Sequence, residues 1–138
     1  MIKSVISAVI LLITGLISYG QAADEYQVYA LRFDESGKIP VRDIAVGTMS
    51  TDSVSVCNMF WYLKGLNGRN ILVDAGFIDT TGTRDGRYER PDSVLGRINV
   101  SPSGITDLII THPHPDHIGG ILLFPHARVW MQKEDFLY

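Results

Sequence analysis

Three of the four histidines in this 138-residue chain fall within six residues, and an aspartate lies between the second and the third. The motif reads His-x-His-x-Asp-His and comprises His112, His114, Asp116 and His117. Imidazole nitrogen and carboxylate oxygen are the ligands that zinc and similar divalent ions take in proteins. In an extended segment His112 and His114 project to the same side and can share one metal ion. Asp116 and His117 follow the turn into a helix and can reach a second ion, so the fold must bring four metal-ligating side chains together.

The position of this motif in the chain agrees with a metal site. It begins directly after the apolar segment 108–111, whose short, continuous run predicts a strand covered on both faces. In open α/β sheets ligands bind outside the carboxyl ends of the strands, where the motif would then lie. The alternative is a loop of surface histidines with Asp116 capping a helix. The density of metal-ligating side chains at this spacing favours metal binding.

Two further polar residues, His126 and Asp74, are candidates for a role in the site. His126 lies nine residues beyond the motif, after a predicted helix and Pro125, which favours a surface or structural role over metal ligation. Asp74 ends a predicted strand. A turn or cap role is slightly favoured for Asp74 over hydrogen-bonding support of a ligating histidine.

The rest of the chain predicts one α/β layer structure, with antiparallel strands first and β-α-β units after them. Asn67-Gly68 separates two apolar runs and is a strong hairpin signal, because both residues tolerate the positive φ of a type I′ turn. The expected elements, in chain order, are a strand at 26–33 that breaks at 35–40, hairpin strands at 54–66 and 69–74, an exposed loop at 80–89, a helix at 91–98, a strand at 108–111, the end of a helix at 121–124, a strand at 128–131 and a first helical turn at 134–138.

The N-terminal segment, residues 1–23, is typical of a secretory signal peptide rather than of a folded domain. It holds one charge, Lys3, followed by an apolar run at 5–17 and by small residues suited to cleavage. The alternative is a membrane anchor, but the run is shorter than the roughly 20 residues that span a bilayer. We therefore expect a secreted or periplasmic protein without stable membrane association after cleavage, and a mature chain of residues 24–138.

The charge balance excludes two classes of partner. Lysine and arginine total 12 against 15 aspartate and glutamate, giving a net charge of −3. Because no basic run is present, nothing in the sequence favours binding to nucleic acid or to an anionic lipid surface. The single cysteine, Cys57, excludes an intrachain disulfide and a cysteine-rich zinc module.

The motif followed by Gly119-Gly120, together with the upstream segment 72–76, resembles the metallo-β-lactamase-fold hydrolases. Within that superfamily the segments 26–32, 70–77 and 105–111 resemble the N-acyl homoserine lactonase branch. The resemblance implies an α/β fold, the αββα sandwich, of which this chain would form the first half only. Residues 24–138 are thus expected to be the N-terminal part of a longer hydrolase domain.

The resemblance also implies a site with two Zn²⁺ ions, with His112 and His114 on the first ion and Asp116 and His117 on the second. The remaining ligands of such a site would lie later in the chain. We expect hydrolysis of a small-molecule cyclic ester, such as an N-acyl homoserine lactone, by attack of a metal-bound hydroxide, with Asp116 also serving catalysis as a proton shuttle. The alternatives are a β-lactam or other ester or thioester hydrolase of the same superfamily, or an inactive truncated remnant.

Overall fold

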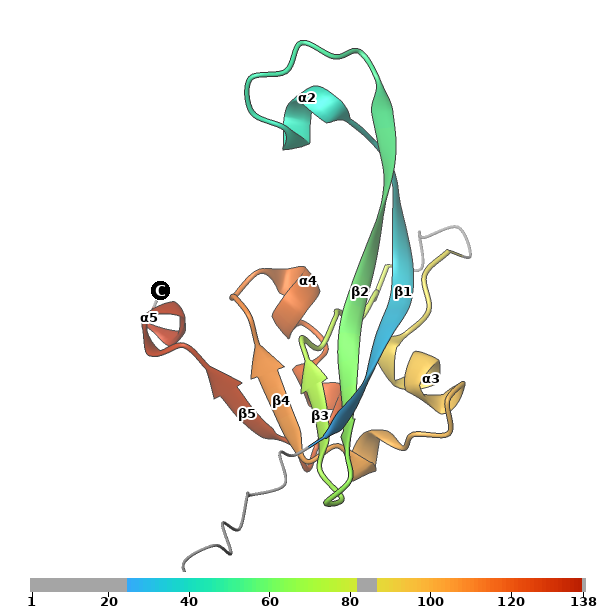
Figure 1. Ribbon diagram of the computed structural model, residues 1–138, viewed down its shortest axis with the longest axis vertical. Coiled ribbons are helices and arrows are strands. Elements are labelled where there is room, and N and C mark those ends of the chain that lie inside the picture. The colour runs from blue at the N-terminus through green and yellow to red at the C-terminus, as the bar shows by residue number, and fades with distance from the viewer. Residues whose placement is uncertain (1–24, 82–86, 138) are drawn as a thin grey trace, which may run out of the picture.

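The computed structural model describes residues 25–81 and 87–137, which form a single mixed sheet with short helices around it (Figure 1). The predicted signal peptide at 1–23 and part of the loop predicted at 80–89 lie outside the described residues. The strands are β1 (Tyr26–Pro40), β2 (Ser53–Gly65), β3 (Asn70–Val73), β4 (Asp107–Ile110) and β5 (Arg128–Met131), in the spatial order β1-β2-β3-β4-β5. The helices are α2 (Val41–Ile44), α3 (Pro91–Gly96), α4 (Pro115–Ile118) and α5 (Lys133–Phe136), with 3₁₀ turns at Pro102–Gly104 and Ile121–Leu123.

The topology confirms the predicted change from antiparallel to parallel pairing. Strands β1, β2 and β3 pair antiparallel, and the turn between β2 and β3 contains Asn67 and Gly68, with φ of 81° at Gly68. Strand β4 pairs parallel with β3 and with β5, each connection passing through helical turns. Parallel strands put their carboxyl ends at the same edge of the sheet. The His-x-His-x-Asp-His motif follows β4 at that edge.

The predicted break in the first strand at 35–40 is wrong. Strand β1 continues to Pro40. Its pairing with β2 shifts register twice, between Arg32 and Asp34 and between Glu35 and Gly37. Gly37 has a φ of 84°, which a residue without Cβ adopts readily. Strands β1 and β2 therefore extend beyond the other strands as a two-stranded arm, residues 34–58, with α2 near its tip (Figure 1).

One face of the sheet carries the core. Leu72 and Leu108 are fully buried at its centre, and Val94 and Leu95 of α3 pack against this face, as the predicted helix at 91–98 requires. The buried cluster comprises Leu31, Phe33, Phe60, Tyr62, Leu72, Ala75, Val94, Leu95, Ile105, Leu108, Ile110 and Phe124.

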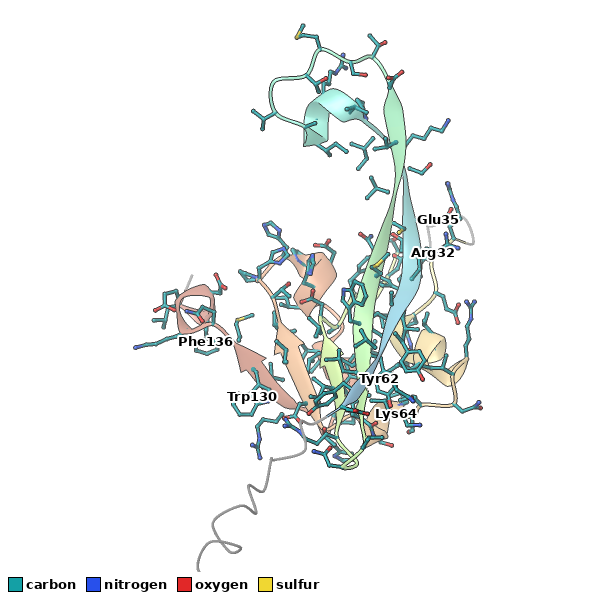
Figure 2. All side chains as sticks on the ribbon, viewed as in Figure 1. Arg32, Glu35, Tyr62, Lys64, Trp130 and Phe136 are labelled. Carbon is teal, nitrogen blue, oxygen red and sulfur yellow. The ribbon has the colours of Figure 1, made fainter. Side chains whose placement is uncertain are left out.

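The opposite face of the sheet carries an exposed apolar row toward the carboxyl ends of β3 and β4. Trp61, Val73, Ile109 and Trp130 are directly paired across β2, β3, β4 and β5, so their side chains share one face. Trp61 is 42% exposed, Ile109 39% and Trp130 47%, and Figure 2 shows Trp130 on β5 among the labelled side chains. The prediction that β4 is covered on both faces therefore fails at Ile109, while its other three residues are buried.

The remaining predictions are mostly confirmed. Strand β5 and the turn of α5 form where the sequence placed them, whereas the predicted helix ending at 121–124 is replaced by the four-residue α4 and a 3₁₀ turn. Cys57 is only partly buried. Within residues 25–81 and 87–137 the structure contains no helix with the length and apolar character needed to cross a membrane.

Candidate metal centre

The four motif residues lie at the carboxyl end of β4, beside the end of β3. Because β3 and β4 are parallel, with Val73 opposite Ile109, the residues that follow each strand leave the sheet at the same edge. The motif first runs extended, with a φ of −68° and a ψ of 145° at His114, and α4 then begins at Pro115. Proline suits the first helical position because its missing N–H needs no intrahelical partner. Asp116 and His117 are thereby turned back toward the two preceding histidines.

The first donor pair is His112 with His114. Their facing ring nitrogens, His112 Nε2 and His114 Nδ1, are 3.1 Å apart. Two nitrogen ligands at tetrahedral positions around zinc, each roughly 2.0–2.1 Å from the ion, are separated by about 3.3 Å. The separation of the two rings is thus compatible with their sharing one ion, as the sequence predicted for this pair.

The second donor pair is Asp116 with His117. Asp116 Oδ2 lies 3.4 Å from His117 Nε2, and the Asp116 side chain is 45% exposed. The two pairs are adjacent, because the ring centroids of His112 and His117 are 3.9 Å apart. The structure therefore brings all four predicted site residues together in two neighbouring pairs.

The donor set is incomplete within the described residues. Catalytic zinc sites take three protein ligands and leave a further position open, whereas no group of three or more His, Cys, Asp or Glu side chains in residues 25–81 and 87–137 is arranged to hold a metal ion. Each pair supplies two suitable donors. These residues fit divalent ions in chemistry and spacing, and each ion would need further ligands.

Asp74 supports the motif directly, which corrects the slight preference for a turn or cap role alone. Its residue is 6% exposed, and its backbone has a φ of 65°, a left-handed conformation that aspartate tolerates. Asp74 Oδ2 lies 2.8 Å from His117 Nδ1. The Asp74 carboxylate also accepts hydrogen bonds from the backbone N–H and the hydroxyl of Thr111, each at 2.9 Å. Asp74 therefore combines the turn role with the supporting role.

Thr111 is a site residue that sequence reasoning missed. Besides contacting Asp74, its Oγ1 lies 3.0 Å from His112 Nδ1 and 3.4 Å from His117 Nδ1. The available signal was a hydroxyl side chain at the strand end, immediately before the first histidine. A hydroxyl there can both donate and accept, which no apolar strand residue can do.

Backbone hydrogen bonds hold the segment after β3 against the motif. The Asp74 N–H donates to the carbonyl of Ile109 at 2.8 Å, and the Ala75 N–H donates to the carbonyl of His117 at 2.8 Å. The Gly120 N–H donates to the carbonyl of Gly76, also at 2.8 Å. A Cβ at Gly120 would overlap the carbonyl oxygen of Ala75. The absence of a side chain at Gly120 therefore allows the motif and the segment after β3 to approach closely.

His126 lies apart from this centre. It is exposed, and it lines an open cavity of about 670 Å³ together with Arg69, Asp107, Arg128 and Trp130. This cavity borders the amino ends of β4 and β5, whereas the motif follows the carboxyl end of β4. The structure agrees with a surface position for His126.

This chain is similar to a known protein family and to several solved structures. A family model described as the metallo-beta-lactamase superfamily matches residues 53–132, more than half of the chain. No match was found among the curated proteins.

Solved structures with the same fold include three hydrolases. A quorum-quenching N-acyl homoserine lactone lactonase has a TM-score of 0.65 at 18% identity, over 80% of this chain and 47% of that chain. A dizinc quorum-quenching lactonase has a TM-score of 0.59 at 22% identity, over 80% and 43%. A probable metal-dependent hydrolase from Staphylococcus aureus has a TM-score of 0.60 at 14% identity, over 81% and 48%. The chain thus spans about half the length of the solved structures that it matches.

Proposed function

The chain belongs to the metallo-β-lactamase superfamily, and from that premise we propose that the protein containing it is a zinc-dependent hydrolase of a cyclic ester such as an N-acyl homoserine lactone. The observation that carries the proposal is the convergence of His112, His114, Asp116 and His117 at one edge of the sheet. Imidazole and carboxylate donors in two adjacent pairs suit a site with two ions. The additional ligands that each ion needs would come from the rest of the protein.

The chemistry of such a site divides between the ions and the protein. When bound, divalent ions supply Lewis acidity and lower the pKa of water toward about 7. His112 and His114 would hold one ion, and Asp116 and His117 the other. Because the Asp116 carboxylate is partly exposed beside His117, it could also take up a proton and pass it to a leaving alkoxide. Asp74 would keep His117 in place throughout, through its 2.8 Å contact with Nδ1.

The choice of a lactone substrate is supported by the structural neighbours. One of them is a quorum-quenching N-acyl homoserine lactone lactonase, and another is a dizinc quorum-quenching lactonase. They share the fold with this chain at 18% and 22% identity. The leader-like segment at 1–23 supports a secreted or periplasmic location, where small extracellular signals would be met. The proposed partner is therefore a small molecule.

The test uses the protein that contains this chain, expressed in full from its gene in zinc-replete medium. The assay measures the ring opening of N-hexanoyl homoserine lactone through the proton that it releases. The wild type should be active, and kcat/KM should fall by at least about a hundredfold with His114→Ala, since loss of one ligand weakens the site. The control variant His126→Ala should retain wild-type kcat/KM, because His126 lies apart from the motif. Undiminished lactonase activity of His114→Ala would contradict the proposal, as would efficient turnover of β-lactams only.

A further inference from the structure

The contacts of Thr111 carry an inference beyond the four metal-ligating residues. Its single hydroxyl touches both donor pairs, through His112 Nδ1 at 3.0 Å and through Asp74, whose carboxylate contacts His117 Nδ1 at 2.8 Å. The Thr111 side chain is thus the point at which the two pairs meet.

The direction of each hydrogen bond follows from the number of protons. An ionised carboxylate can only accept, and both Asp74 oxygens lie 2.9 Å from Thr111 Oγ1, so the single hydroxyl proton of Thr111 goes to Asp74. Thr111 Oγ1 can then only accept from His112, which must carry its proton on Nδ1. His117 Nδ1 faces Asp74 Oδ2 and must carry a proton there as well. In both rings Nε2 is then the nitrogen that faces the neighbouring donor, His114 Nδ1 at 3.1 Å from His112 and Asp116 Oδ2 at 3.4 Å from His117, and that is available to an ion.

We propose that Thr111 is a positioning residue for both donor pairs: it accepts the Nδ1 proton of His112 while its own proton goes to the carboxylate that orients His117. The inference rests on the proposed metal-dependent function, because fixing Nε2 as the free nitrogen matters only where that nitrogen binds an ion. A histidine without such a partner divides between tautomers and loses its ring orientation, which reduces metal affinity.

The arrangement predicts a specific hierarchy among variants. Thr111→Val removes the acceptor of His112 but leaves Asp74 to hold His117, so the fixed tautomer of His112 alone is lost. In Asp74→Asn the amide oxygen must stay where it accepts from the Thr111 N–H, and it can still accept from the Thr111 hydroxyl, so the tautomer of His112 is kept. The NH2 group then faces His117 Nδ1 and should reverse the tautomer of His117 alone. Thr111→Ser keeps the hydroxyl and should preserve both tautomers.

The experiment records long-range proton–nitrogen NMR spectra of the histidine rings in the metal-free form of the full protein that contains this chain, and then titrates zinc. The wild type and Thr111→Ser should show His112 and His117 protonated on Nδ1, and Thr111→Val should show the change in His112 only. Zinc affinity should fall roughly 10–100-fold in Thr111→Val and stay within about threefold of wild type in Thr111→Ser. Thr51→Val, a substitution on the exposed loop before β2, serves as the matched control and should change neither readout.

Two results would overturn the inference. One is a wild-type spectrum with His112 protonated on Nε2. This test does not depend on whether any variant folds. The other is a folded Thr111→Val that keeps the wild-type His112 tautomer and zinc affinity. The expected tautomers combined with no zinc binding by the wild type would instead contradict the proposed function, so the two failures are distinguishable.

Discussion

At the residue scale, the candidate metal centre depends on side chains that can be identified in the sequence and on one, Thr111, that cannot. The ligand types of His112, His114, Asp116 and His117 and their spacing suffice to predict a metal site. The contact between Asp74 and Thr111 requires knowing that β3 and β4 are parallel neighbours, because these residues are 37 positions apart in the chain. Local sequence patterns carry no such information, so sequence reasoning slightly favoured a turn or cap role for Asp74 and gave Thr111 no role.

Gly120 provides a test of how closely the motif packs against the segment that follows β3. Gly120→Ala should destabilise the fold by about 1–3 kcal/mol, because the new Cβ would overlap the carbonyl oxygen of Ala75 and force apart the segments joined by the hydrogen bond from Gly120 to Gly76. Urea unfolding of the two proteins measures the difference.

The matched control is Gly96→Ala in α3. A Cβ at Gly96 meets no atom within 4 Å, so that variant should be neutral or slightly more stable than wild type. Equal effects of the two substitutions would show that the close approach at Gly120 is not constraining.

At the scale of elements, the hairpin turn, α3 and the parallel strands could be predicted, whereas the arm could not. The Asn67-Gly68 turn is encoded locally. The continuation of β1 through 35–40 depends instead on its pairing with β2, which overrides the unfavourable strand propensity of the polar and glycine residues in that segment. The exposure of Ile109 on β4 likewise depends on what packs against the sheet. A short apolar run in the sequence does not say whether another layer covers the strand.

The arm should be the least protected part of the sheet. In residues 35–40 and 53–58 strands β1 and β2 pair only with each other, and an isolated two-stranded ribbon is marginally stable in water. Hydrogen exchange followed by mass spectrometry should show faster exchange there than in residues 60–64 and 107–110. Equal protection of the two regions would mean that the arm is covered by something beyond the described contacts.

The link between β4 and β5 should give the fold a dependence on acid pH. The Trp130 Nε1–H donates to Asp107 at 2.8 Å and, with smaller contributions from Thr106 and Arg69, holds the pKa of the Asp107 carboxyl below its usual range, against the opposing effect of burial. A depressed folded pKa contributes stability that is present above the unfolded value of about 3.9 and is lost as the pH falls through the folded pKa.

Trp130→Phe removes that donor and isolates its contribution. The loss of unfolding free energy should be about 1 kcal/mol or more at pH 7 and smaller at pH 3, where Asp107 is increasingly protonated. The pH-independent remainder reports the smaller packing area of the phenyl ring and its weaker attraction for Arg128. Trp61→Phe, on the same face of the sheet, should show the same difference at both pH values, and a pH-independent effect for Trp130→Phe would refute the assignment.

At the scale of the whole molecule, the uncovered apolar face is the most consequential feature. Trp61, Ile109 and Trp130 form one exposed row, and soluble proteins rarely leave a large contiguous apolar surface open to water. The resemblance to the αββα sandwich implies a second sheet on this face, and the chain spans about half the length of the structures that it matches.

Residues 24–138 produced alone should therefore self-associate through this face. Sedimentation velocity should show concentration-dependent oligomers, and Ile109→Lys should shift the distribution toward monomer. Val46→Lys, at an equally apolar but isolated position on the arm, should leave it unchanged. A monodisperse wild-type monomer would contradict the expectation.

Metal binding at the motif is tested most directly by a zinc titration of the full protein that contains this chain, monitored through its histidine ring resonances. His126 serves as an internal control, because it is exposed and lies at the other end of the strands. If the motif binds metal, the resonances of His112, His114 and His117 should shift together on addition of zinc while those of His126 should not. A response confined to His126, or no response from the three motif histidines, would contradict metal binding at the motif.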